Sequence, residues 1–246
     1  MSAAHLAPVL SAPPPQAAAP RLPDGFRVGA LVPVFNEAET LGPLLERLKR
    51  EVETVLVVDD GSSDGSGDIA QAAGVGVHRR PNGGKGRALR SGFARLLKQD
   101  LTHLVTLDAD GQHRPEDVPR FRRAALRCGA ALVIGSRLGQ REGYPAARRQ
   151  ANVVGDWFIS KVMGTEVEDA QSGFRLYDAA VLRRLRLHEE GFAIETELLI
   201  RIIRAGGRIA RVPIPAIYDT AISSYFRPVM DTYRCLLAGF QALEDL

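Results

Sequence analysis

The stretch LTHLVTLDADGQH, residues 101–113, is a short apolar run that ends abruptly in carboxylates. Residues 101–107 are typical of a buried strand, and Asp108 and Asp110 follow where such a strand would end. Two carboxylates held close together repel each other, which costs free energy unless a cation or a ligand compensates their charges. A D-x-D pair can hold one hard divalent cation through oxygen. His113 is either an added ligand or a loop histidine.

Outward from this stretch, short apolar runs alternate with longer segments of helical spacing. We expect strands at 27–34, 54–60, 75–80, 101–108, 130–137 and 208–214. We expect helices at 38–50, 64–74, 84–100, 115–129, 146–164, 195–207 and 227–246. Alternation of this kind is the signature of βαβ units. The sequence therefore predicts an α/β fold, with a mostly parallel twisted sheet and helices on both faces.

The two ends of the chain differ from the alternating region. Residues 1–25 are rich in Ala and Pro, which predicts a disordered tail rather than a signal peptide. We assign residues 26–226 to one α/β domain and 227–246 to an amphipathic C-terminal helix. For that helix and for 146–163, an ordinary core face and a face lying on a membrane both fit the apolar spacing.

The composition is that of an ordinary globular protein. A formal net charge of +3 is too small an excess to indicate nucleic-acid binding, so we expect no nucleic-acid partner. Cys128 and Cys235 are far apart and lack a metal-ligand partner at CxxC spacing, which favours a reducing compartment and a cytoplasmic location. The clustered arginines of 114–149 fit either solvated helix faces or a surface that faces an anion or a membrane.

Acidic residues follow three of the expected strands, in PVFNEAE (33–39), VVDDGSSDGS (57–66) and LDADGQH (107–113). The carboxyl ends of parallel strands meet at one edge of the sheet, where ligands bind. Helix capping is the favoured explanation for Ser62, Ser63 and Asp64, but it does not explain both Asp59 and Asp60. The loop PNGGKGRAL (81–89) lacks the Walker spacing, so Lys85 and Arg87 either touch an anionic ligand or shape the loop.

Six motifs in this order and spacing resemble those of the family 2 glycosyltransferases, most closely the dolichyl-phosphate mannose synthase-like branch. They are VPVFNEAETL, VVDDGSSDGS, NGGKGRAL, LDADGQHRPED, IGSR and DAQSGFRLY, within residues 26–215. The resemblance implies a GT-A fold, a GDP- or UDP-sugar donor, Mg²⁺ or Mn²⁺, and inversion at the anomeric carbon. It also implies a polyprenyl phosphate acceptor, which would place the protein peripherally on the inner face of the membrane.

By matching motif positions, the resemblance implies a set of site residues. The expected nucleotide-sugar-binding residues are Pro33, Phe35, Glu37, Val58, Asp60, Asp108, Ala109 and Arg137. The expected metal ligands are Asp108, Asp110 and Gln112, and the expected catalytic residues are Asp110, Asp169 and Arg175. A lipid phosphate is already an anion and needs no general base, whereas a hydroxyl acceptor needs one. Asp169 is the first candidate for that base, ahead of Glu195 and Glu197; otherwise it is a helix cap or an ion-pair partner of Arg175.

Some positions depart from the pattern of this branch. Phe35 stands where a tyrosine is usual, and Asp219 and Tyr225 stand where the synthases carry a basic pair, with Arg227 as a replacement. Two alternatives remain open: transfer to a soluble hydroxyl acceptor, and a non-catalytic module that binds nucleotide sugars. A dinucleotide-dependent oxidoreductase ranks last, because no G-x-G-x-x-G follows the first strand. The oligomeric state, including a homo-oligomer, is left open.

Overall fold

A computed structural model of the chain describes residues 10–11, 25–137, 146–215 and 217. The expected C-terminal helix 227–246 lies outside the described residues, as do Asp219, Tyr225, Arg227 and Cys235. Most of the expected disordered tail lies outside them as well. In the described part of the chain, no helix is both long enough and apolar enough to cross a bilayer.

The described strands form one sheet of eight, in the order β1-β8-β6-β7-β5-β2-β3-β4. The strands are β1 Leu10–Ser11, β2 Val28–Val34, β3 Thr54–Asp59, β4 Gly76–Arg79, β5 His103–Thr106, β6 Leu132–Ser136, β7 Arg175–Asp178 and β8 Ile209–Pro213. Every pairing is parallel except those of β7, which runs antiparallel to both β5 and β6. The prediction of an α/β fold with a mostly parallel sheet is confirmed.

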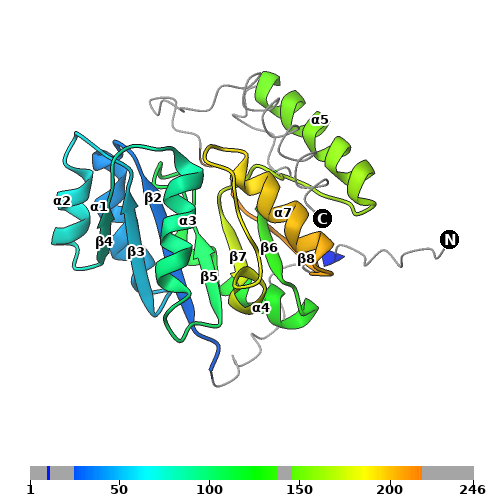
Figure 1. Cartoon of the computed structure of the whole chain (residues 1–246), viewed down its shortest axis with the longest axis horizontal. Helices are drawn as coiled ribbons and strands as arrows, with labels where there is room; N and C mark the ends of the chain where they lie inside the picture. The colour runs from blue at the N-terminus through cyan, green and yellow to red at the C-terminus, as the bar shows by residue number, and fades with distance from the viewer. Residues whose placement is uncertain (1–9, 12–24, 138–145, 216, 218–246) are drawn as a thin grey trace.

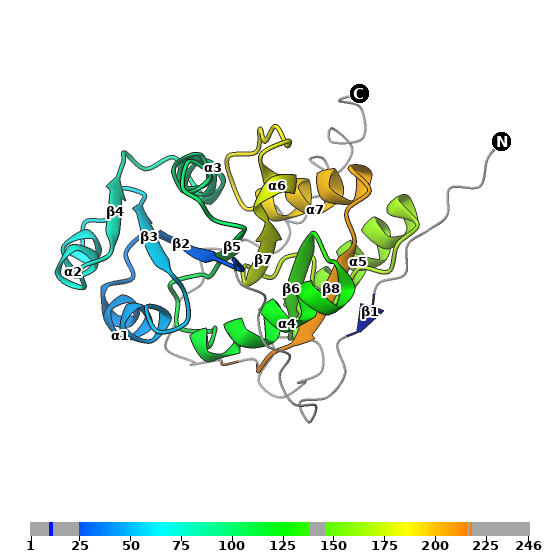
Figure 2. The ribbon, with the colours of Figure 1, turned by 90° about the horizontal axis from the view of Figure 1, so that it is seen from below.

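Helices cover both faces of the sheet (Figures 1 and 2). They are α1 Ala38–Leu48, α2 Ser66–Ala72, α3 Lys85–Leu96, α4 Val118–Cys128, α5 Ala146–Met163, α6 Ala179–Leu182 and α7 Ile194–Arg204, with a 3-10 turn at Pro115–Asp117 before α4. On one face α1, α2 and α4 bury apolar side chains against the strands. On the other face a second core joins α3 and α7 with side chains from α5 and α6. Strands that are covered on both faces have sequences of nearly continuous apolar residues.

Two strands, β1 and β7, and the short helix α6 were not among the expected elements. Leu10–Ser11, within the stretch expected to be a disordered tail, pair in parallel with β8. Strand β7 was not predicted, because it has four residues and sits inside a sequence motif rather than in a long apolar run. As an antiparallel strand, β7 begins at the edge where its neighbours end: Arg175 lies opposite Thr106 at the end of β5. The loop before β7 therefore lies at the same edge of the sheet as the carboxyl ends of the parallel strands.

Candidate active site

Acidic side chains crowd together where β2 and β5 end. The hydroxyl of Thr40 in α1 donates to the carbonyl of Ala109 at 2.6 Å, which fastens the residues after β2 to the D-x-D loop. Burial, followed by repulsion from Asp108, raises the pKa of Asp110 to about 6. Burial, followed by the charges of Asp110 and Asp108, raises the pKa of Glu37 to about 7. The structure thus brings together the predicted residues Glu37, Asp108 and Asp110.

Lys85 at the start of α3 supplies a positive charge to this cluster. Its Nζ lies 2.6 Å from Oδ1 of Asp108 and 2.6 Å from Oε1 of Glu195, in the first turn of α7. Burial alone would raise the pKa of Asp108, but the adjacent Lys85 keeps it below its usual value. The two roles left open for Lys85 were contact with an anionic ligand and shaping of the loop, whereas the structure shows ion pairs with the carboxylates of Asp108 and Glu195. The sequence feature that pointed to Lys85 was its position directly after two glycines, at the start of an expected helix.

The loop before β7 packs directly on Asp108. A Cβ added to Gly173 would lie 2.1 Å from Oδ2 of Asp108, so a larger residue there would displace the aspartate. The hydroxyl of Thr106 donates to the carbonyl of Gly173 at 2.9 Å and holds the loop to the end of β5. The motif SGFR is therefore tied to the D-x-D motif by close contact.

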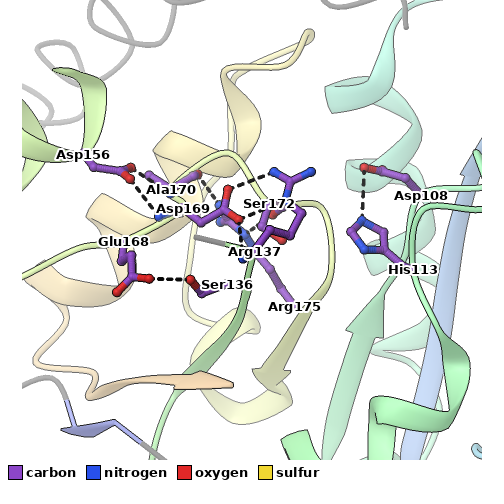
Figure 3. A network of polar contacts seen from close by, with 10 residues as sticks. All are labelled: Asp108, His113, Ser136, Arg137, Asp156, Glu168, Asp169, Ala170, Ser172 and Arg175. Atoms are coloured by element: carbon purple, nitrogen blue, oxygen red, sulfur yellow. Dashed lines mark hydrogen bonds and ion pairs between the residues drawn. The ribbon is translucent and has the colours of Figure 1, made fainter. Parts of the chain in front are cut away.

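Arg137 and Asp169 form a bidentate ion pair beside this loop (Figure 3). Nε of Arg137 lies 2.9 Å from Oδ2 of Asp169, and Nη2 lies 2.8 Å from Oδ1. Burial alone would raise the pKa of Asp169, but the Arg137 guanidinium lowers it below its usual value. An ionised carboxylate held in this way is a weak general base. The ion-pair partner of Asp169 is thus Arg137, and the alternative pairing with Arg175 is wrong.

The catalytic role expected of Arg175 does not fit its surroundings. Its side chain is fully buried, and the guanidinium donates to the carbonyls of Ala170, Ser172 and Glu195. Arg175 starts a strand that lies between two others, so its side chain is enclosed where the loop and α7 meet. The geometry makes it a support of the loop rather than a group that contacts substrate.

The residues expected to contact the nucleotide fall into two groups. Pro33, Phe35 and Glu37 are only partly buried, at the end of β2. Val58 and Ala109 are buried in opposite cores, with exposures of 0% and 3%, so any contact they make with a nucleotide would come from the backbone. In a strand covered on both faces, the apolar run alone does not show which side chain points where.

Asp60 has partners other than a ligand. Its carboxylate accepts from the backbone N–H of Gly83 at 3.1 Å and of Gly84 at 2.7 Å, and from Nη1 of Arg80 at 2.6 Å. The carboxylate is 6% exposed. In this structure Asp60 holds the glycine loop that leads into α3, and so it places Lys85 indirectly.

Ser62 and Asp64 fasten the start of α1. The Ser62 hydroxyl accepts from the N–H of Asn36 at 3.0 Å, and Asp64 accepts from the N–H of Ala38 at 2.9 Å. Asp64 also accepts from the N–H of Ser66 at the start of α2. Asp64 thus accepts from the first residues of two helices, although the N-cap positions themselves are occupied by Glu37 in α1 and Gly65 in α2.

His113 and Glu197 contribute to packing rather than to the acidic cluster. His113 is 2% exposed beside Phe174, with Nε2 4.0 Å from Oδ2 of Asp108, and burial lowers its pKa to about 4. It is therefore neutral at pH 7 and lies too far away for a hydrogen bond to Asp108. Glu197 accepts from the N–H groups of His188 and Glu189 and holds the loop before α7.

The fold and these acidic strand ends define a class of protein, the GT-A enzymes. The chain superposes on the crystal structure of glucosyl-3-phosphoglycerate synthase from Mycobacterium tuberculosis in complex with Mn²⁺, UDP-glucose and phosphoglyceric acid. The TM-score is 0.75 at 21% identity, over 97% of this chain and 88% of that one. The likeness shows the GT-A fold that the motifs implied.

Residues 30–189 match the family model for glycosyl transferase family 2, and the chain belongs to that family. It is 36% identical to undecaprenyl-phosphate mannosyltransferase of Micrococcus luteus, over 77% of this chain and 83% of the relative. It is 32% identical to polyprenol monophosphomannose synthase of Mycolicibacterium smegmatis, over 76% of each. These relatives confirm the resemblance to the dolichyl-phosphate mannose synthase-like branch, and with it the prediction of a glycosyltransferase.

Proposed function

We propose that the protein transfers a sugar from a GDP- or UDP-sugar to a polyprenyl phosphate, with inversion at the anomeric carbon and with the help of a divalent cation. The observation that carries this proposal is the acidic cluster at the ends of β2 and β5, where burial, together with the neighbouring carboxylates, raises the pKa of both Glu37 and Asp110. The relatives support the choice of acceptor, because two of them are named for transfer to, or synthesis on, a polyprenyl phosphate.

The residues present fit a divalent cation. Asp110 is pushed toward protonation by burial and by Asp108, and a bound cation would relieve that repulsion. Within the described ranges, no three His, Cys, Asp or Glu side chains come together as a complete ligand set. Mg²⁺ and Mn²⁺ usually keep part of their coordination shell for substrate phosphates, so a site that the donor completes needs fewer protein ligands.

Asp108, Asp110 and Gln112 would hold the cation. When bound there, it would neutralise charge that develops on the departing nucleoside diphosphate. The metal in the superposed structure is Mn²⁺, which supports a site of this type.

The remaining charged groups fit an acceptor that is already an anion. Asp169 is locked in an ion pair with Arg137, and its lowered pKa makes it a poor proton acceptor. A phosphate monoester needs no base, only positive charge to orient it. We therefore assign Arg137 to the acceptor phosphate, while Lys85 fixes Asp108 for the donor side.

The outer surface of α5 supports a peripheral position on the membrane. Val153 is 51% exposed and Trp157 is 61% exposed, and the two are one helical turn apart. Helix α5 contacts the turn of Asp169, which pairs with Arg137. An exposed apolar pair on such a helix can lie in the headgroup region of a bilayer. We infer that the protein binds the inner face of the membrane through this surface.

A partition assay tests the proposal. The protein is incubated with radiolabelled GDP-mannose or UDP-glucose, Mn²⁺ and undecaprenyl phosphate in detergent, and counts are measured in the organic phase. We expect counts that depend on the lipid phosphate and disappear with a chelator or in Asp110→Asn. Counts that stay in water with a soluble acceptor would support the hydroxyl-acceptor alternative. Nucleotide binding without any turnover would support the non-catalytic module.

A further inference from the structure

Asp156 of α5 lies against the turn that carries Asp169 (Figure 3). Its Oδ2 accepts from the N–H of Asp169 at 2.8 Å, and its Oδ1 accepts from the N–H of Ala170 at 2.9 Å. The residue is 7% exposed. It therefore acts as a buried acceptor for two consecutive backbone donors, and it belongs to the same helix as the exposed Trp157.

The turn it holds has an unfavourable backbone conformation. Asp169 has a φ of +55°, and among the described non-glycine residues only Asn36 shares a positive φ. Consecutive N–H groups around a left-handed residue form a small concavity that binds anions. Here the anion is the Asp156 carboxylate. A strained residue persists only where its surroundings hold it, and such residues cluster at functional sites.

The same turn aims the groups assigned to the reaction. The carboxylate of Asp169 orients the Arg137 guanidinium by two hydrogen bonds and also accepts from the Arg137 backbone N–H at 3.0 Å. The carbonyl of Asp169 accepts from the N–H of Ser172 at 3.0 Å, in the loop whose Gly173 touches Asp108. A shift of this turn would therefore move Arg137 and the wall beside Asp108 together.

We propose that Asp156 is a positioning residue for sugar transfer, which holds the left-handed turn at Asp169 and thereby aims Arg137. This inference rests on the proposed function. Asp156 itself contacts backbone N–H groups of the turn, and its effect passes through Asp169. Because it stands on α5, it also connects the helix that carries Val153 and Trp157 at the surface with the reacting groups.

The chain offers a matched control in Asp178. Its Oδ1 accepts from two consecutive backbone N–H groups, those of Ala180 at 2.6 Å and Val181 at 3.2 Å, at the start of α6. Asp178→Asn, like Asp156→Asn, replaces a carboxylate that accepts from two consecutive N–H groups with an amide, although Asp178 serves both groups through one oxygen and Asp156 uses one oxygen for each. Asp178 is at the far end of β7 from Arg175, away from the acidic cluster.

The test compares kcat and KM for the two variants with undecaprenyl phosphate as acceptor, at about pH 8, because burial raises the pKa of Asp156 to about 7. We expect Asp156→Asn to lower kcat by ~10- to 100-fold with little change in the donor KM, since misplacement of a positioning group acts on the reacting geometry. Asp178→Asn is expected to keep kcat within about twofold of the wild type, even if its melting temperature falls as much as that of Asp156→Asn.

A double-mutant cycle with Arg137→Lys separates positioning from general destabilisation. If Asp156 acts through Arg137, Asp156→Asn costs much less in the Arg137→Lys background than in the wild type. Equal losses in both backgrounds, or a wild-type kcat in Asp156→Asn, would overturn the inference.

If Asp156→Asn does not fold, Asp156→Glu replaces it, and the inference predicts a reduced kcat that again depends on Arg137. A wild-type kcat in Asp156→Glu, or a loss that is the same in both backgrounds, would overturn it in that case. A wild-type protein that transfers no sugar would instead overturn the proposed function, and this inference with it.

Discussion

The Nζ atom of Lys85 lies 2.6 Å from Oδ1 of Asp108, in a site where the Asp108 side chain is 26% exposed and the Lys85 side chain 14% exposed. The same ammonium is 2.6 Å from Oε1 of Glu195. One buried cation thus joins the start of α3, the D-x-D loop and the start of α7. Burial alone would lower the pKa of Lys85, but the two carboxylates raise it, so the lysine stays charged.

Lys85→Met leaves the partly buried carboxylate of Asp108 and the buried carboxylate of Glu195 without their cation. Breaking a buried ion pair by removing one partner costs about 3 kcal/mol in the free energy of unfolding. Urea denaturation measures that change. Lys49→Met is the control, because Lys49 pairs with Glu46 on the surface and its removal is expected to cost less than about 1 kcal/mol. Equal stability of the two variants would contradict a structural role for the Lys85 bridge.

The raised pKa of Asp110 makes stability depend on pH. The pKa of about 6 in the folded protein exceeds the ordinary aspartate value of 3.8. Between these values the folded protein binds the proton and the unfolded chain does not, so stability falls as pH rises. Asp110→Asn removes this titration and part of the upward effect on Glu37.

We therefore expect the stability of the wild type, relative to Asp110→Asn, to fall by about 2–3 kcal/mol from about pH 4 to about pH 7, without metal. Urea denaturation in the presence of a chelator is the measurement. If the difference in the free energy of unfolding between the two proteins stays constant across this range, the pKa of Asp110 is not raised in the folded protein.

Metal and nucleotide should bind together at the D-x-D loop. We expect Mn²⁺ to strengthen binding of GDP or UDP to the wild type, and Asp110→Asn to weaken that enhancement by at least ~10-fold. Isothermal titration calorimetry with and without Mn²⁺ measures both quantities. Asp178→Asn serves as the control and should keep the enhancement. Undiminished enhancement in Asp110→Asn would place the cation elsewhere.

Arg175 is expected to matter for stability. Arg175→Lys cannot reproduce a guanidinium fork that serves three carbonyl groups, so buried acceptors lose their donors. We expect a loss of about 3 kcal/mol in the free energy of unfolding. Thermal or urea denaturation decides the point. A fully stable Arg175→Lys with reduced transfer would restore the role in substrate contact that its motif position implied.

The sequence was sufficient for the architecture and for the acidic strand ends. Helical and strand periodicities predicted the α/β sheet, because parallel strands covered on both faces leave continuous apolar runs. The D-x-D pair was recognisable because repulsion between neighbouring carboxylates needs compensation. The short β7 left no such signal, since four residues of mixed polarity do not show a period.

Other features depend on contacts between distant parts of the chain. The pairing of Lys85 with Glu195 requires α3 and α7 to begin side by side, which no local pattern specifies. The burial of Arg175 follows from the position of β7 inside the sheet, and the support of Asp169 by Asp156 follows from the packing of α5. A motif shows which residues belong to a site, but only packing shows which of them face a ligand.

The most direct measurement of the central claim is mass spectrometry of the lipid after reaction with GDP-mannose or UDP-glucose, Mn²⁺ and undecaprenyl phosphate. The proposal predicts a lipid phosphate heavier by one sugar unit with the wild type and unmodified lipid with Asp110→Asn. Unmodified lipid with the wild type, together with a sugar attached to a soluble hydroxyl acceptor under the same conditions, would contradict it.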